Sequence, residues 1–153
     1  MKHLLALLCA VLVGGGLVSA ARAEAPVPAS VLIVLGSNQG EGTDASLVKI
    51  EALRKAPFDS FSKKTLLKRI DVQLTVGKDA EIELPNGRRL RLGVLERTSD
   101  GRFRVSVSIN RPGKRDYLPV MTVIAAPGDP FFVAGQRYEG GTLIIGVTVG
   151  KGG

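Results

Sequence analysis

The stretch IDVQLTVGKDAEIELPNGRRLRLGVLERTSDGRFRVSVSI, residues 70–109, decides the fold class. Apolar and polar residues alternate along it in four runs, which cover residues 70–76, 80–84, 89–94 and 102–109. This period of two is typical of strands with one buried face. Turn signals separate the runs: Gly77-Lys78-Asp79, Pro85-Asn86-Gly87 and Asp100-Gly101. We therefore predict a four-stranded antiparallel meander with one face in solvent.

A buried strand and a helix are predicted on the N-terminal side of this meander. The run VLIVLG at residues 31–36 is continuously apolar, which indicates a strand buried on both faces. After a Gly-rich loop, residues 44–56 predict a helix, with a capping aspartate at its start and a proline after its end. Leu47, Ile50 and Leu53 give this helix an apolar stripe, so we expect it to pack on a sheet.

Three further strands are predicted on the C-terminal side. Residues 117–126 contain Pro119, which favours a place at a sheet edge or a bulge. Residues 131–134 form a short second strand after a Pro-Gly turn. Residues 142–149, TLIIGVTV, are apolar on both faces, like residues 31–36. We therefore expect these two strands to lie in the middle of the fold.

These patterns define the fold class and the organisation of the chain. We predict a mainly β protein, an antiparallel β-sandwich or partly closed barrel of about eight strands with one appended α-helix. Its single β-rich domain covers residues 31–149. A Pro- and Ala-rich linker at residues 24–30 precedes it, and a flexible tail at residues 150–153 follows.

Residues 1–23 are predicted to be a signal peptide. Lys2 provides the positive start, residues 4–13 are apolar, and Ala21-Arg22-Ala23 fits a small-x-small cleavage site. The apolar run is shorter than the roughly 20 residues of a membrane-spanning helix, so we expect cleavage after Ala23 and no transmembrane segment in the product. The predicted destination is the periplasm or the extracellular space.

The rare residues exclude several kinds of catalyst. The chain has no Trp, and its one His and one Cys are His3 and Cys9. Both leave with the predicted signal peptide. The remaining chain then cannot form a catalytic triad that uses His, a Cys nucleophile, a His/Cys zinc site or a disulfide. We therefore predict a non-enzymatic protein without a cofactor or a metal site. A carboxylate-dependent hydrolase that uses Asp129 and Glu139 is a remote alternative.

Positive charge is concentrated in one part of the chain. The net charge is +7, and residues 88–115 contain only two acids. The nine cationic residues there are Arg88, Arg89, Arg91, Arg97, Arg102, Arg104, Arg111, Lys114 and Arg115. A two-residue turn at Asp100-Gly101 would place Arg97 opposite Arg104 on the solvent face, where like charges repel.

The neighbouring strand offsets part of this charge. Glu81 and Glu83 would share a face with Arg89 and Arg91 and form cross-strand pairs with them. We therefore predict Arg91, Arg97, Arg102 and Arg104 as the candidate anion- or partner-binding residues.

Two functions fit these features. The leading hypothesis is a structural or protein-interaction component of the bacterial envelope, which binds an unknown envelope protein through strand edges or the arginine face. The alternative is a binder of anionic polysaccharide or of a lipid surface. Nucleic acid is not favoured, because the arginine face has no aromatic residues on which bases could stack. The salt dependence of binding would discriminate between the two.

Two segments resemble known families. The run LGSNQG at residues 35–40 resembles the opening of the hydroxymethyl-dihydropterin pyrophosphokinases, but the metal-binding Asp pair and the basic catalytic motif are missing further on. Gly128, Gly135, Gly140-Gly141 and residues 142–149 resemble the ending of small uncharacterised exported bacterial β-proteins, and are loosely similar to the closing strands of secretin domains. This resemblance implies an envelope location and β-structure, not a pore.

Overall fold

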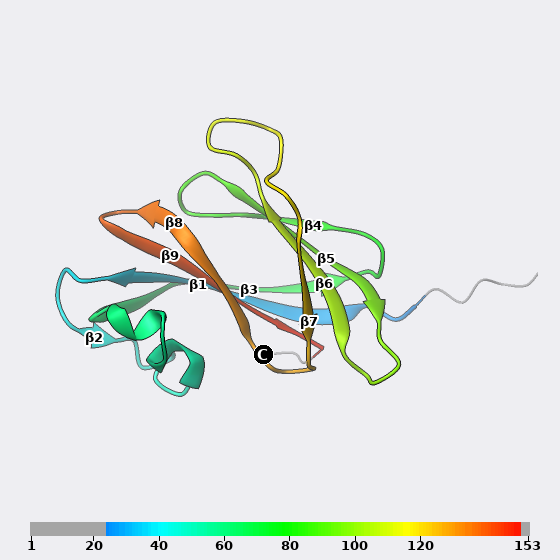
Figure 1. The fold of residues 1–153 in the computed structure, drawn as a ribbon, viewed down its shortest axis with the longest axis horizontal. Helices are drawn as coiled ribbons and strands as arrows, with labels where there is room; N and C mark the ends of the chain where they lie inside the picture. The colour runs from blue at the N-terminus through cyan, green and yellow to red at the C-terminus, as the bar shows by residue number, and fades with distance from the viewer. Residues whose placement is uncertain (1–23, 151–153) are drawn as a thin grey trace, which may run out of the picture.

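Two sheets, antiparallel except for the short pairing of β2 with β3, make up most of residues 24–150, the part of the chain that the computed structural model describes (Figure 1). The five-stranded sheet has the order β2-β3-β1-β9-β8 and consists of β1 (Val27–Ser37), β2 (Gly42–Thr43), β3 (Lys63–Leu74), β8 (Phe131–Tyr138) and β9 (Gly141–Val149). The four-stranded sheet has the order β4-β5-β6-β7 and consists of β4 (Ala80–Glu83), β5 (Arg89–Arg97), β6 (Phe103–Ile109) and β7 (Met121–Ala125). The predicted signal peptide and residues 151–153 of the predicted tail lie outside the described residues.

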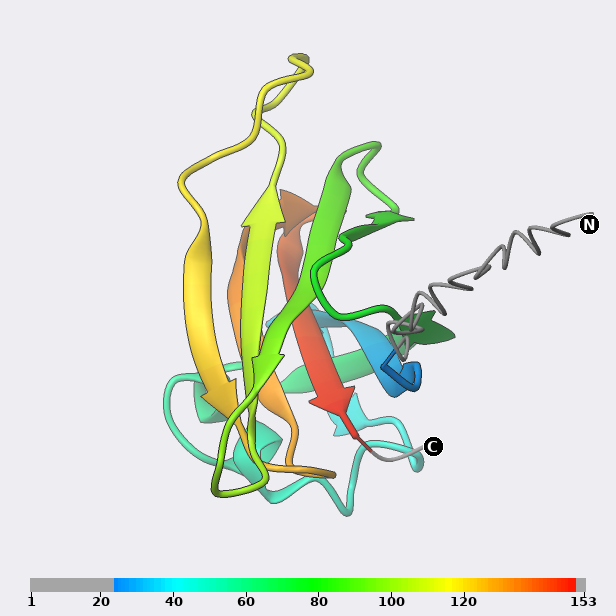
Figure 2. The same cartoon turned by 90° about the vertical axis from the view of Figure 1, so that its right-hand side faces the viewer.

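The two sheets form separate layers around one apolar core (Figure 2). Ile33 of β1 and Ile145 of β9 face Leu90 of β5 and Val105 of β6, and all four are fully buried. The inner faces come from the alternating residues of the sequence, as a period of two requires. The prediction of a mainly β sandwich is confirmed, and the described sheets do not close into a barrel.

Strands β1 and β9 lie in the middle of the five-stranded sheet, as their apolar sequences predict. Their second face is also buried, in a smaller cluster that contains Leu32, Val34 and Ile144. Leu47, Leu53 and Phe58 cover this cluster from outside the sheet. The continuous apolar runs of β1 and β9 therefore follow from burial on both faces.

The prediction of an α-helix over residues 44–56 is wrong, although the segment packs on a sheet as expected. The segment is a series of tight turns in which Leu47, Ile50 and Leu53 each donate a backbone hydrogen bond three residues back, over 2.8 to 3.1 Å. A 3₁₀ turn, η1 (Glu51–Arg54), is its regular part, and a second one, η2 (Phe58–Ser60), follows it. Side chains three residues apart eclipse in a 3₁₀ helix, so all three apolar residues face the sheet. An α-helix would rotate them progressively away from it.

The predicted meander contains the wrong first strand. Residues 70–76 were expected to pair with residues 80–84, but β3 runs antiparallel to β1 in the other sheet, from Val27 opposite Leu74 to Ser37 opposite Lys63. The meander is β4-β5-β6-β7 instead. Alternation of polar and apolar residues determines which side chains of a strand face the core. It does not determine which other strand pairs with it. Residues 75–79 carry the chain from one sheet to the other.

Two boundaries also differ from prediction. Val27 is fully buried and begins β1, so only the first residues of the predicted linker at 24–30 precede the sheet. The strand predicted over residues 117–126 is regular only over Met121–Ala125, after Pro119. It lies at the edge of its sheet, as the proline indicated.

Replacement of Leu53 by Ala tests the packing of the 3₁₀ segment. Leu53 is 1% exposed, so we expect Leu53→Ala to lower the free energy of unfolding by about 2–5 kcal/mol, measured by urea denaturation. Val48, in the same segment, is 48% exposed, and Val48→Ala is expected to change the free energy of unfolding by less than about 0.5 kcal/mol. Equally small effects of both variants would contradict the packing of this segment on the sheet.

Candidate functional site

The pairing of β5 with β6 differs from prediction at the arginines. Glu96 lies opposite Arg104, and Arg97 lies opposite Phe103, so the predicted opposition of Arg97 and Arg104 is wrong. The hairpin has a three-residue loop over residues 99–101, closed by Gly101 in the left-handed region (φ +81°), in place of the two-residue turn. A bulge at Leu95 then restores the register of the core residues.

Three of the four candidate arginines gather at one end of β5 and β6, and each has a partner there. Arg104 Nε donates to Glu96 Oε1 over 2.8 Å, and Arg102 Nε lies 2.9 Å from Asp100 Oδ2. The Arg97 guanidinium lies 5.2 Å from the centre of the Phe103 ring and donates to the Ala25 carbonyl over 3.2 Å. Carboxylates therefore neutralise much of this surface.

Arg91, the fourth candidate, belongs to a different cluster on the same sheet. Its guanidinium lies 3.8 Å from the centre of the Tyr117 ring and donates to Glu81 Oε1 over 3.1 Å. Tyr117 donates its hydroxyl to the same oxygen over 2.9 Å, and Arg89 lies 3.5 Å from Glu81 Oε2. As predicted, Glu81 and Glu83 share a face with Arg89 and Arg91, and the register places Glu81 opposite Arg91 and Glu83 opposite Arg89.

This cluster shifts the ionisation of two groups. The hydrogen bonds from Tyr117 and Arg91 stabilise the charged carboxylate and lower the pKa of Glu81 below its usual value of 4.5. Desolvation, followed by the hydrogen bond to Glu81, raises the pKa of Tyr117 above 10.0. Both shifts favour the arrangement in which a neutral tyrosine donates to a charged carboxylate.

A concentration of cations, most of them without a carboxylate partner among the described residues, lies in a hollow that the sequence alone did not indicate. We call it the basic hollow, and it has a volume of about 560 Å³. Its cationic lining consists of Arg88, Arg89, Lys114, Arg115 and Arg137, and no acid lines it. The first four belong to the basic stretch noted in the sequence, whereas Arg137 comes from β8 of the other sheet and could be found only from the fold.

Two buried amides build the basic hollow. Asn110 (6% exposed) accepts from the Arg89 backbone N–H over 2.6 Å, and its Nδ2 donates to the Lys114 carbonyl over 2.9 Å. The Arg88 guanidinium donates through two of its nitrogens to the Asn110 carbonyl. Gln136 accepts from Asn86 Nδ2 over 3.0 Å, which joins the two sheets at this end. Loops far apart in the sequence are thus held side by side.

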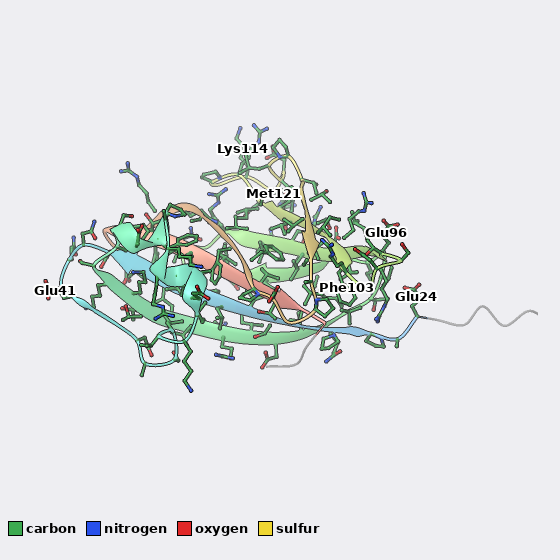
Figure 3. The ribbon with its side chains drawn as sticks, turned by 60° about the horizontal axis from the view of Figure 1, so that its bottom comes forward. Glu24, Glu41, Glu96, Phe103, Lys114 and Met121 are labelled. Atoms are coloured by element: carbon green, nitrogen blue, oxygen red, sulfur yellow. The ribbon has the colours of Figure 1, made fainter. Side chains whose placement is uncertain are left out.

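Figure 3 shows that Lys114, which lines the basic hollow, lies apart from Glu96 and Phe103, the partners of Arg104 and Arg97. Lys114 lies on the loop that projects from the sandwich, with Met121 below it. Glu96 and Phe103, the neighbours of Arg104 and Arg97, lie toward the end where Glu24 enters the fold.

Strand β7 provides a second feature, an exposed apolar edge. Met121 and Ile124 are 43% and 46% exposed, and Val120 just before the strand is 63% exposed. A groove of about 330 Å³ runs between β7 and β8, lined in part by Leu118, Met121 and Val133. The basic hollow and this groove share Arg88 and Gln136, so the apolar groove ends at a cation.

A further hollow of about 700 Å³ lies at the turn between β8 and β9 and is lined by Asn38, Tyr138 and Glu139 among others. Asn38 Oδ1 accepts from the Ser62 backbone N–H over 2.9 Å, so the asparagine of the LGSNQG run fixes a loop. Asp129, the second carboxylate of the remote hydrolase alternative, lies at the opposite end of β8, more than about 20 Å along the strand. The two carboxylates therefore do not face one another across a glycosidic bond.

Comparisons with known proteins identify no relative, because no family model, no curated protein and no solved structure matches the chain. Within residues 24–150, no helix is long and apolar enough to cross a membrane. In the same residues, no three acidic, His or Cys side chains are grouped so that they could hold a metal ion. The class that the fold and site define is a β-sandwich with an open strand edge and a basic hollow.

A tyrosine titration tests the cluster around Glu81. The chain has two tyrosines, and both are expected to ionise above pH 10.0, since desolvation and the hydrogen bond to Glu81 raise the pKa of Tyr117 and the hydrogen bond to Glu139 raises that of Tyr138. The variant Glu81→Gln removes the negative charge beside Tyr117, so ultraviolet titration should show one transition moving down toward pH 10.0. The Tyr138 transition is the internal control and should stay in place. Two unchanged transitions would contradict the contact between Tyr117 and Glu81.

Proposed function

We propose that this protein is an exported, non-enzymatic β module that binds another protein of the bacterial envelope. In this proposal an extended segment of the partner pairs with β7 and adds a fifth strand to the four-stranded sheet. The observation that carries the proposal is the state of the β7 edge, which is apolar, exposed and without the usual protection against pairing.

The other edge strands of the described sheets differ from β7 in this respect. Edge strands are usually blunted by short length, charge, proline or a bulge. Strand β2 has two residues, β4 has four and carries Glu81 and Glu83, and β8 is interrupted by a bulge at Gly135 and carries Arg137. Within Met121–Ala125 there is no charge and no proline, and the pairing with β6 has no irregularity. Strand β7 is therefore the edge best suited to a new strand.

The surroundings of β7 indicate the chemistry of the partner segment. Side chains on one face of an added strand would reach the groove between β7 and β8, where Leu118, Met121 and Val133 favour apolar residues. Arg88 at the end of the groove favours an acidic residue there. The expected partner segment is therefore extended, with apolar side chains at alternate positions and a carboxylate beyond them.

The alternative function, binding of an anionic polymer or lipid through Arg91, Arg97, Arg102 and Arg104, has weaker support. Arg91, Arg102 and Arg104 each have a carboxylate partner, and Arg97 lies against Phe103. An external anion would have to compete with these partners.

Site-specific photo-cross-linking tests the β7 proposal. A photoreactive residue at Thr122, in the middle of β7, should form a cross-link to one defined segment of an envelope protein when the protein is expressed in its own cells. A synthetic peptide of that segment should then protect the backbone amides of Met121–Ala125 from hydrogen exchange.

Export is tested on the same preparation, in which the protein chain should begin at Glu24.

Paired lysine variants provide the control. The double variant Val120→Lys/Ile124→Lys places charge along the edge and should weaken peptide binding by about tenfold or more, because lysine blocks strand addition. The double variant Val48→Lys/Leu67→Lys makes the same chemical change at residues that are 48% and 36% exposed, and should retain binding. Scattered cross-links, cross-links only to a second copy of the chain, or protection outside β7 would overturn the proposal.

A further inference from the structure

We propose that the basic hollow is a binding site for a phosphate group, next to the groove beside β7, with which it shares Arg88 and Gln136. The ligand is a polyvalent phosphate, either of a soluble molecule or of a lipid headgroup. It would be held by Lys114, Arg115 and Arg137, with Arg88 and Arg89 at the base.

Uncompensated charge is the first argument for this site. In residues 24–150, Arg88, Lys114, Arg115 and Arg137 have no carboxylate within 4.0 Å, and Arg89 has only Glu81 at 3.5 Å. The neighbouring loop residue Arg111 differs, since it lies 3.0 Å from Asp116. Cations that converge on one concave surface repel one another, and a bound anion relieves this repulsion.

The second argument is that the basic hollow is built on buried groups. The Arg88 guanidinium is held against the Asn110 carbonyl, and the Lys114 main chain is held by the Asn110 side chain. Gln136 is 9% exposed and is held by Asn86, so the strand that carries Arg137 is fixed against the β4–β5 loop. The Arg88 guanidinium and the backbone that carries Lys114 and Arg137 are therefore in place before a ligand arrives, which lowers the entropy lost on binding.

The number and type of cations favour phosphate over a single carboxylate. A guanidinium presents a planar fork of donors that matches two oxygens of one phosphate, and four of the five cations of this lining are arginines, which come from the start of β5, the β6–β7 loop and β8. One carboxylate offers one charge, whereas a phosphate ester or diphosphate offers more charge and more acceptor oxygens. The apolar groove beside the hollow, which shares Arg88 with it, is the reason to include lipid headgroups as a source.

Calorimetric titration of the purified full chain with inorganic pyrophosphate tests the soluble source. Co-sedimentation with vesicles of phosphatidic acid, whose headgroup is a phosphate monoester, and phosphatidylcholine tests the headgroup source, with pure phosphatidylcholine vesicles as the neutral comparison. The triple variant Lys114→Ser/Arg115→Ser/Arg137→Ser should weaken binding by about tenfold or more, because charge-assisted hydrogen bonds are lost. All three side chains are exposed and make no hydrogen bond to other described residues, so the fold should be kept.

The control is the variant Lys49→Ser/Arg69→Ser/Lys78→Ser, which removes three exposed cations from other surfaces. This control variant has the same net charge as the first variant. Its affinity for the probe should fall by less than about threefold, because only long-range attraction changes. Pyrophosphate binding without vesicle binding assigns a soluble ligand, and vesicle binding assigns a headgroup. Equal losses in both variants, or no binding of either probe, would overturn the proposal. The Val120→Lys/Ile124→Lys variant should bind the probe normally, which keeps this result separate from the test of β7.

Discussion

The pairing of β1 with β9 is the constraint on which the rest of the structure depends. The ladder runs from Ala29 opposite Val149 to Gly36 opposite Thr142, and it joins the two ends of the described chain. Both faces of this ladder are apolar, so the sheet must be covered on each side. The four-stranded sheet covers one face, and the segment with the 3₁₀ turns covers the other. Neither cover would have an apolar surface to pack on without this central pair.

The two candidate binding features are consequences of the same arrangement. Strand β8 pairs only with β9, on the far side of the sheet from β3, and its end carries Gln136 and Arg137 to the loops of the other sheet. The basic hollow therefore receives residues from both sheets. Between β7 and β8 the chain changes sheets, so these two edge strands are neighbours in sequence but are not hydrogen-bonded to each other. The groove between them and the free edge of β7 follow directly.

Much of the fold could be predicted from the sequence because the relevant signals are local. Runs with a period of two gave the faces of the strands, and continuous apolar runs correctly placed residues 31–36 and 142–149 in the middle. The 3₁₀ segment had a usable signal that was interpreted as an α-helix. Its apolar residues Leu47, Ile50 and Leu53 repeat strictly every three positions, which fits a 3₁₀ turn better than a period of 3.6. The partner of β3 had no such signal, since alternation does not specify a neighbour.

The candidate site was less predictable because it depends on register and on tertiary contacts. One extra loop residue after Arg97 replaced a predicted repulsion with the ion pair between Glu96 and Arg104. The expected charge excess at the arginine face thereby disappeared. Arg137 stands far from the basic stretch in the sequence, and only the hydrogen bond between Asn86 and Gln136 shows that it joins that stretch. Local sequence patterns contain no information on such contacts.

Amide hydrogen exchange is the most direct test of the central claim that the paired β1 and β9 strands organise the fold. The amides of residues 31–34 and 143–147 should exchange most slowly, at the rate of global unfolding, because both faces of these strands are buried. The amides of β7 should exchange much faster, since this strand is an exposed edge. Exchange in β1 and β9 as fast as in β7 would contradict the account.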